Sequence, residues 1–116
     1  MSQTRIYHNP RCSKSRQTLA ILHDNNENIE IIEYLKQPPS PAELAELVKQ
    51  LAISPRQLLR KTETEYKVLG LNNTELSDTA LLEIMSQHPK LIERPIVVKN
   101  GKARLGRPPE AVTEIL

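Results

Sequence analysis

A strand-to-helix junction is encoded by residues 7–16, which read Tyr7-His8-Asn9-Pro10-Arg11-Cys12-Ser13-Lys14-Ser15-Arg16. The β-prone run of residues 4–7 predicts a strand, and the one-sided apolar pattern that follows predicts a helix over residues 13–24. Cys12, the only cysteine, would lie at the first turn of that helix, after a tight Asn-Pro loop. Unpaired backbone N–H groups and the positive end of the helix dipole favour an anion there, including a thiolate.

Cys12 admits a reactive and an inert interpretation. A single cysteine in a soluble protein is most often a small buried hydrophobe. The strand–loop–helix setting and the positive potential of His8, Arg11, Lys14 and Arg16 argue equally for a nucleophile, so both interpretations stay open at this point. A Cys-x-x-Cys redox pair is excluded because Ser15 occupies the second position, and a phosphatase-type loop is excluded because Thr18 stands where that loop carries arginine.

The bulk composition narrows the class of protein. The 116 residues are typical of one domain with a modest core. A formal net charge of +2 and an aromatic content of 3% indicate no broad surface for nucleic acid. No apolar run reaches membrane-spanning length, and the N-terminus has no signal-peptide core. We expect a cytoplasmic protein that binds neither nucleic acid nor membranes, and a single cysteine fits that reducing compartment.

The remaining strand patterns predict an α/β fold. Residues 29–34 alternate apolar and polar, so they would close a parallel βαβ unit with the first strand and helix. Residues 94–99 and 102–105 flank Asn100-Gly101, a strong hairpin signal, and residues 110–116 predict a last helix. The first loop therefore lies at the carboxyl end of a strand, where open α/β sheets bind ligands.

Residues 38–89 are expected to form an all-helical insertion between the two halves of the sheet. Its helices are predicted to begin after Ser40, Ser54 and Ser77, whereas residues 61–73 are polar and expected to be irregular. The prediction is a single thioredoxin-like domain over residues 1–116. It has a mixed four-stranded sheet in the order β-α-β, helical insertion, β-β-α.

Several motifs together resemble the ArsC family of glutaredoxin-dependent arsenate reductases, nearly end to end. The resemblance rests on residues 8–16, Leu58-Leu59-Arg60-Lys61, Gln87-His88-Pro89, residues 93–98 and Gly106-Arg107-Pro108. It implies that Cys12 attacks arsenate, that His8 supports activity, and that the oxyanion is bound by Arg60, Arg94 and Arg107. It further implies glutathione as co-substrate, glutaredoxin as partner, arsenite as product, and neither a metal nor a tightly bound cofactor.

The chemistry of the residues agrees with that implication. Arsenate carries about one to two negative charges near neutral pH, like phosphate, so a thiolate that attacks it needs fixed cations. Arginine suits this role because its planar fork donates pairwise to oxyanions and keeps its charge. With no second thiol in the chain, an external thiol must resolve a Cys12 adduct. The other arginines considered, Arg5, Arg16, Arg56 and Arg104, are expected to be solvated surface residues.

Three further residues carry expectations of their own. His8 is either a partly exposed histidine at a strand end or a group that assists the thiol as imidazolium or as base. Ser15 is a supporting residue that could hydrogen-bond the thiolate or cap the backbone. Pro95 is also a supporting residue, and the resemblance to thioredoxin-like proteins predicts a cis Arg94–Pro95 bond, although trans bonds are commoner overall.

The active-loop residues also depart from the family pattern. Established arsenate reductases of the family tend to carry Ala, Gly and Thr where this chain has Arg11, Ser13 and Lys14. Some relatives share the fold but are non-enzymatic adaptors that bind RNA polymerase, and those often carry a Cys-x-x-Cys that is absent here. An adaptor would be favoured by a buried, inert Cys12 together with an exposed apolar patch on the insertion.

Overall fold

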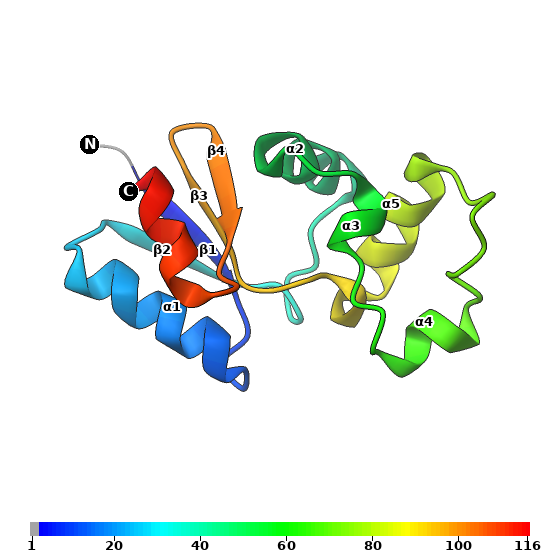
Figure 1. Ribbon diagram of the computed structural model, residues 1–116, viewed down its shortest axis with the longest axis horizontal. Coiled ribbons are helices and arrows are strands. Elements are labelled where there is room, and N and C mark those ends of the chain that lie inside the picture. The colour runs from blue at the N-terminus through cyan, green and yellow to red at the C-terminus, as the bar shows by residue number, and fades with distance from the viewer. Residues whose placement is uncertain (1–2) are drawn as a thin grey trace. The chain divides into compact units, whose positions relative to one another are not determined.

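The computed structural model describes residues 3–116 and contains one mixed sheet of four strands (Figure 1). The strands are β1 (Thr4–His8), β2 (Ile29–Glu33), β3 (Ile96–Lys99) and β4 (Lys102–Leu105). Their order is β2-β1-β3-β4, with β1 parallel to β2 and the other two pairs antiparallel. The expected α/β, thioredoxin-like fold class is confirmed.

Two helices pack on the same face of this sheet. Helix α1 (Ser13–Asp24) contributes Leu22, and the 3₁₀ helix η2 (Pro109–Ile115) contributes Val112. Both side chains pack against Ile6 and Val97, which are paired in register on β1 and β3. All four are fully buried, and each stabilises the fold by about 1.5–3 kcal/mol through removal of apolar surface from water. The last helix was predicted from Glu110, and it begins one residue earlier, at Pro109.

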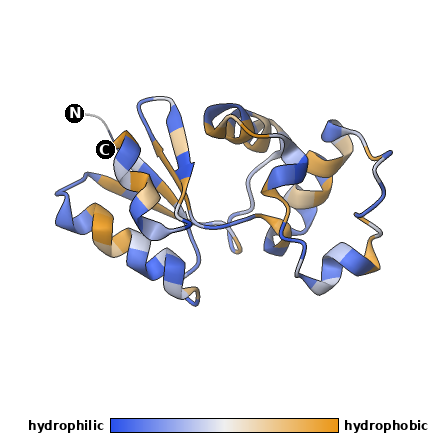
Figure 2. Cartoon of the chain, viewed as in Figure 1, coloured by the Kyte–Doolittle hydropathy of each residue, from blue (hydrophilic) through white to orange (hydrophobic). Residues whose placement is uncertain are grey.

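Residues 38–93 form a second compact unit, which is helical. Its elements are α2 (Pro41–Leu51), α3 (Pro55–Leu58), α4 (Thr64–Val68), α5 (Asp78–Gln87) and the 3₁₀ helix η1 (Pro89–Leu91). Serine side chains cap three of the helices, at Ser40, Ser54 and Ser77, as predicted. Helices α2 and α5 pack on each other, and both carry apolar residues in Figure 2. Their buried side chains include Leu44, Leu47, Leu81 and Met85.

The polar segment of residues 61–73 contains a short helix where an irregular segment was predicted. Helix α4 is held by backbone bonds such as Leu69 N–H to the Glu65 carbonyl, at 3.0 Å. It has no buried residue, and Val68 is 75% exposed. No apolar stripe marks this helix in the sequence, because its single turn packs no side chain into a core.

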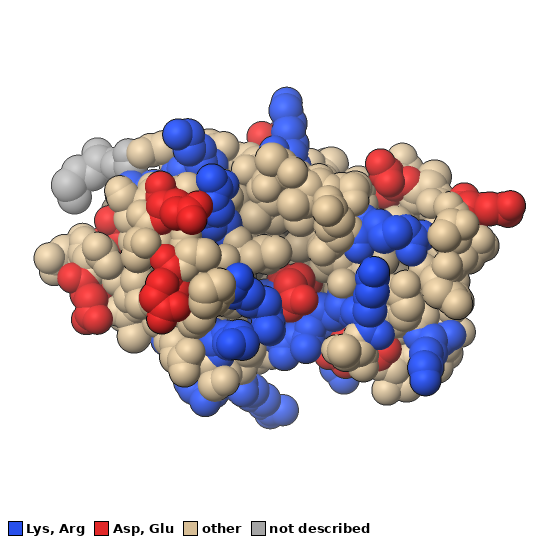
Figure 3. Space-filling view, viewed as in Figure 1, with Lys and Arg blue, Asp and Glu red and all other residues tan. Residues whose placement is uncertain are grey.

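The other compact unit comprises the residues up to 37 and residues 94–116, and so holds the whole sheet with α1 and η2. Within the described part of the chain, no helix is both long and apolar enough to cross a membrane. Basic and acidic side chains are interspersed on the face seen in Figure 3, in keeping with the net charge of +2.

Candidate active site

Cys12 is the N-cap residue of α1, at the carboxyl end of β1. Its side chain makes no capping hydrogen bond and is partly exposed. The backbone around it is ordered, because Cys12 N–H donates to the Asn9 carbonyl and Arg16 N–H donates to the Cys12 carbonyl, each at 3.0 Å. Cys12 is thus partly exposed, makes no capping bond through its side chain, and lies where helix N–H groups favour an anion.

The loop that presents Cys12 is braced from two sides. The Asn9 side-chain oxygen accepts the Arg11 N–H at 3.0 Å, which forms a local turn. Arg16 Nη1 donates to the Pro10 carbonyl at 2.9 Å. Arg16 is exposed, as expected, yet it also ties the first turn of α1 back to the loop. The Asn-Pro pair was the only sequence signal for this arrangement.

His8 and Ser15 form a buried polar pair behind this loop. His8 Nδ1 lies 2.6 Å from Ser15 Oγ, which also accepts the Asn9 N–H at 3.0 Å. His8 is 6% exposed and Ser15 is fully buried, so of the two alternatives for His8, the partly exposed histidine at a strand end is wrong. The serine bonds the backbone, one of its two expected roles, and also binds His8, a contact that sequence reasoning missed. The strand end and the first helical turn meet here through side chains seven residues apart.

Burial controls the charge of His8. The pKa of His8 is lowered from 6.5 mainly because burial disfavours the imidazolium, and the charge of Arg16 lowers it further. The Glu33 carboxylate acts in the opposite direction. A lowered pKa keeps His8 neutral near pH 7, so the ring can exchange a proton but adds little fixed positive charge.

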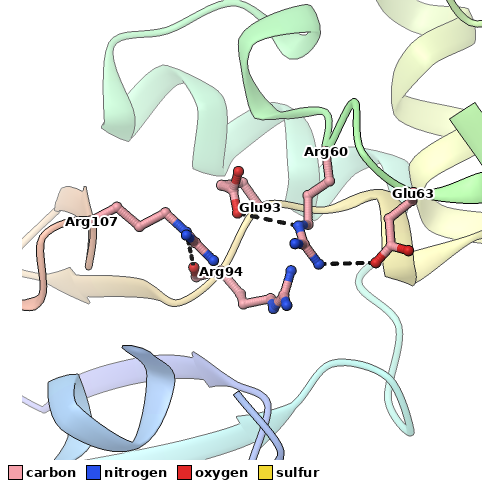
Figure 4. A network of polar contacts seen from close by, with 5 residues as sticks. All are labelled: Arg60, Glu63, Glu93, Arg94 and Arg107. Atoms are coloured by element: carbon pink, nitrogen blue, oxygen red, sulfur yellow. Dashed lines mark hydrogen bonds and ion pairs between the residues drawn. The ribbon is translucent and has the colours of Figure 1, made fainter. Parts of the chain in front are cut away.

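Arg94 and Arg107 flank the hairpin of β3 and β4 and are linked to each other. Arg107 Nε donates to the Arg94 carbonyl at 2.8 Å (Figure 4). The Arg94–Pro95 peptide bond is cis, as predicted, and so is Arg107–Pro108. Gly106 N–H donates to the Pro95 carbonyl at 2.9 Å. These contacts fix the backbone at both arginines.

Gly106 allows the chain to pack tightly at this point. A Cβ built on Gly106 would overlap Thr18 Oγ1 and the ring of Pro95. Only glycine therefore lets the end of β4 lie against both α1 and the start of β3. Thr18 and Gly106 were not recognised as positioning residues from the sequence, because a close approach between distant segments leaves no local pattern.

Arg60 lies in the helical unit, just after α3. Its backbone N–H donates to the Leu91 carbonyl at 2.7 Å, next to an isolated bridge between Leu59 and Ile92. Arg60 Nη1 is 2.9 Å from Glu63 Oε1, and Nε is 3.5 Å from Glu93 Oε1. Figure 4 shows the guanidinium between these two carboxylates. The side chain is 18% exposed, so Arg60 is held in a defined direction.

The candidate residues are distributed over both compact units. Cys12, His8, Ser15, Pro95, Arg94 and Arg107 belong to the unit with the sheet, whereas Arg60 belongs to residues 38–93. Within the first unit, the structure joins His8 and Ser15 to the Cys12 loop, and it joins Arg107 to Arg94.

The chain is similar to known proteins along nearly its whole length. The chain is 53% identical to "Uncharacterized protein YfgD" of Escherichia coli (strain K12), over 98% of this chain and 97% of that protein. It is 48% identical to "Arsenate reductase" of Haemophilus influenzae, over 96% of this chain and 97% of the relative. The solved structure "Arsenate reductase from Vibrio cholerae" superposes with a TM-score of 0.97 at 52% identity, covering 99% of this chain and 98% of that one. The model of the ArsC family matches residues 7–115, and the chain therefore belongs to the ArsC family.

Proposed function

We propose that this protein reduces arsenate to arsenite through a covalent adduct on Cys12, with glutathione and glutaredoxin as the source of electrons. One observation carries the proposal: a partly exposed cysteine lies at the N-terminus of α1 and its side chain makes no capping bond. The ArsC family and the arsenate reductases among its relatives supply the substrate class.

The overall reaction balances with two external thiols. Arsenic acid and two thiols give arsenous acid, one disulfide and one water, so arsenic gains the two electrons that two sulfurs lose. In the first step, the Cys12 thiolate bonds to arsenic(V) and an oxygen of arsenate leaves as water after protonation. The thiolate and the oxyanion are both negative, so the step depends on positive charge at the site.

The second step needs a thiol from outside the chain, because Cys12 is the only cysteine. Glutathione sulfur bonds to Cys12 sulfur, the sulfur–arsenic bond breaks, and its electron pair leaves with arsenic as arsenite. The product on the protein is a mixed disulfide of Cys12 and glutathione. A glutaredoxin thiol then attacks the glutathione sulfur and Cys12 leaves as the thiol, so glutaredoxin supplies the second external thiol and the disulfide formed joins glutathione to glutaredoxin.

Each remaining candidate has a role in this scheme. Arg94, Arg107 and Arg60 bind the arsenate oxygens through paired N–H donors. Neutral His8, buried and held by Ser15, transfers protons near the loop instead of acting as a fixed cation. Pro95 supports the backbone next to Arg94 and against Gly106.

A coupled assay tests the proposal. Purified protein, arsenate, glutathione, glutaredoxin and glutathione reductase should oxidise NADPH, and arsenite should accumulate in step. Cys12→Ser should abolish turnover with an unchanged melting temperature, because a serine hydroxyl is not ionised near neutral pH. Arsenate reduction by Cys12→Ser at the wild-type rate would rule out the adduct, and a wild-type protein that makes no arsenite would rule out the activity.

The adaptor alternative has less support. Val68 and Leu69 on the helical unit are 75% and 41% exposed, which supplies a small apolar patch. The second feature expected of an adaptor, a buried cysteine, is not found, since Cys12 is partly exposed.

A further inference from the structure

A cavity of about 260 Å³ borders the Cys12 loop within the sheet unit. One wall is made by His8, Asn9, Pro10 and Arg11, and the other by residues that follow or end β2, namely Glu33, Leu35 and Lys36. Its volume is just below the range of about 300–1,000 Å³ for sites of small-molecule ligands. The cavity is therefore suited to part of a small molecule, with the rest of that molecule extending outside.

The cavity is lined by the three residues that precede Cys12 in the chain. Cys12 N–H donates to the Asn9 carbonyl and closes a four-residue turn. In such a turn the first and last Cα atoms lie within about 7 Å of each other. An extended tripeptide spans about 10 Å. A peptide with one end in the cavity can therefore place a central thiol over the Asn9–Cys12 turn.

The lining has a mixed charge pattern. Arg11 and Lys36 supply cations, Glu33 supplies one carboxylate, and Pro10 and Leu35 supply apolar surface. Lys36 Nζ is 3.6 Å from Glu33 Oε1, with the side chains 78% and 40% exposed. A pair so exposed contributes little to stability, so either partner can turn to a ligand.

We propose that this cavity binds the thiol co-substrate, with a carboxylate of glutathione on Lys36 and Arg11 and its ammonium group on Glu33. Glutathione has two carboxylates, one ammonium group and a thiol on its central residue, and that pattern complements the lining. The assignment rests on the proposed function for the identity of the thiol. Inorganic arsenate is a poorer match for two reasons. The Glu33 carboxylate would repel a compact dianion, and the apolar walls would leave its oxygens without enough hydrogen-bond donors.

The binding test uses S-methylglutathione, which cannot react. In an NMR titration it should shift the backbone resonances of His8, Asn9, Arg11, Leu35 and Lys36. The analogue whose glycine carboxylate is an amide should bind more weakly. Equal shifts from inorganic sulfate at the same ionic strength, or no shifts at these residues, would overturn the assignment.

A charge reversal with a matched control gives the second test. Lys36→Glu should weaken S-methylglutathione binding and raise the KM for glutathione, each by about 3–10-fold. Lys102→Glu makes the same change at an exposed lysine on β4 of the same unit, outside the cavity, and should match the wild type. Equal effects of the two variants would overturn the assignment.

The two proposals fail separately. A protein that binds S-methylglutathione at these residues but makes no arsenite would refute the arsenate activity and support the cavity. A protein that reduces arsenate while the titration stays silent would refute the cavity alone.

Discussion

His8 and Ser15 are joined at 2.6 Å beneath the loop that carries Cys12, and the same serine oxygen accepts the Asn9 N–H. Ser15→Ala should therefore lower the free energy of unfolding by about 1–3 kcal/mol, because it leaves buried polar groups without their partner. Urea unfolding measures the loss. Ser13→Ala, at an exposed position two residues earlier in α1, is the matched control and should stay near the wild type. Equal stability of Ser15→Ala and Ser13→Ala would contradict the structural role.

The burial of His8 predicts a pH dependence of stability. Because its pKa is lowered from 6.5 in the folded protein, the unfolded chain binds the proton more tightly. The unfolded state then carries more protons at pH values between the two pKa values, so the free energy of unfolding rises with pH there. This contribution is fully present above 6.5 and is lost as the pH falls below it.

Urea unfolding from about pH 5 to about pH 8 measures that slope. His8→Gln should flatten it, since the titrating ring is gone. Glu33→Gln gives an independent check by NMR: the Glu33 carboxylate raises the pKa of His8, so its removal should lower that pKa further. An unchanged slope in His8→Gln would show that His8 does not cause the pH dependence, and a raised pKa in Glu33→Gln would show that the Glu33 carboxylate does not stabilise the imidazolium.

The contribution of Arg94 and Arg107 to arsenate reduction should depend on the shape of the guanidinium group as well as on its charge. Arg107→Lys loses the Nε donor to the Arg94 carbonyl, and either lysine variant loses paired donation to a tetrahedral oxyanion. We expect kcat/KM for arsenate to fall about 10–100-fold in each, the equivalent of one charged hydrogen bond of about 1.5–3 kcal/mol.

Arg104→Lys is the control for both. Arg104 Nε is 3.1 Å from Glu114 Oε2 in an exposed ion pair on the same hairpin, so the substitution should have little effect on arsenate kinetics. Steady-state assays on the three variants, with thermal melts, make the comparison. A loss in Arg104→Lys as large as in the other two, or no loss in any, would place the anion site elsewhere.

The sheet and most helices could be predicted because each has a local signal. Alternation marked β2, Asn100-Gly101 marked the hairpin turn, and serine caps marked α2, α3 and α5. Helix α4 had no such signal, because nothing in it is buried. Local pattern is strong where a segment packs against a core and weak where it does not.

The contacts at the candidate site depended on distances that no local pattern specifies. Ser15 reaches His8 only because β1 and α1 bring positions seven residues apart together. Gly106 meets Thr18 and Pro95 across three segments, and Arg60 reaches Glu93 through the bridge between Leu59 and Ile92. The residue types of the site could be predicted from the sequence, whereas their hydrogen-bond partners could be identified only in the folded structure.

The two carboxylates around Arg60 should restrain its attraction for an anion. Glu63→Gln removes a negative charge 2.9 Å from Arg60 Nη1, yet its side-chain oxygen can still accept that hydrogen bond and keep the guanidinium oriented. If Arg60 binds arsenate, the KM for arsenate should fall about 1.5–5-fold, the range expected when a partly exposed ion pair of about 0.2–1 kcal/mol no longer competes.

Glu114→Gln makes the same change beside Arg104, which has no role in the proposed site, and should leave that KM unchanged. Raising the salt concentration should shrink the gap between Glu63→Gln and the wild type, since it is electrostatic in origin. A KM that rises in Glu63→Gln would mean that the carboxylate serves Arg60 mainly by orienting it. Equal KM values in Glu63→Gln and Glu114→Gln would mean that Arg60 does not bind the substrate.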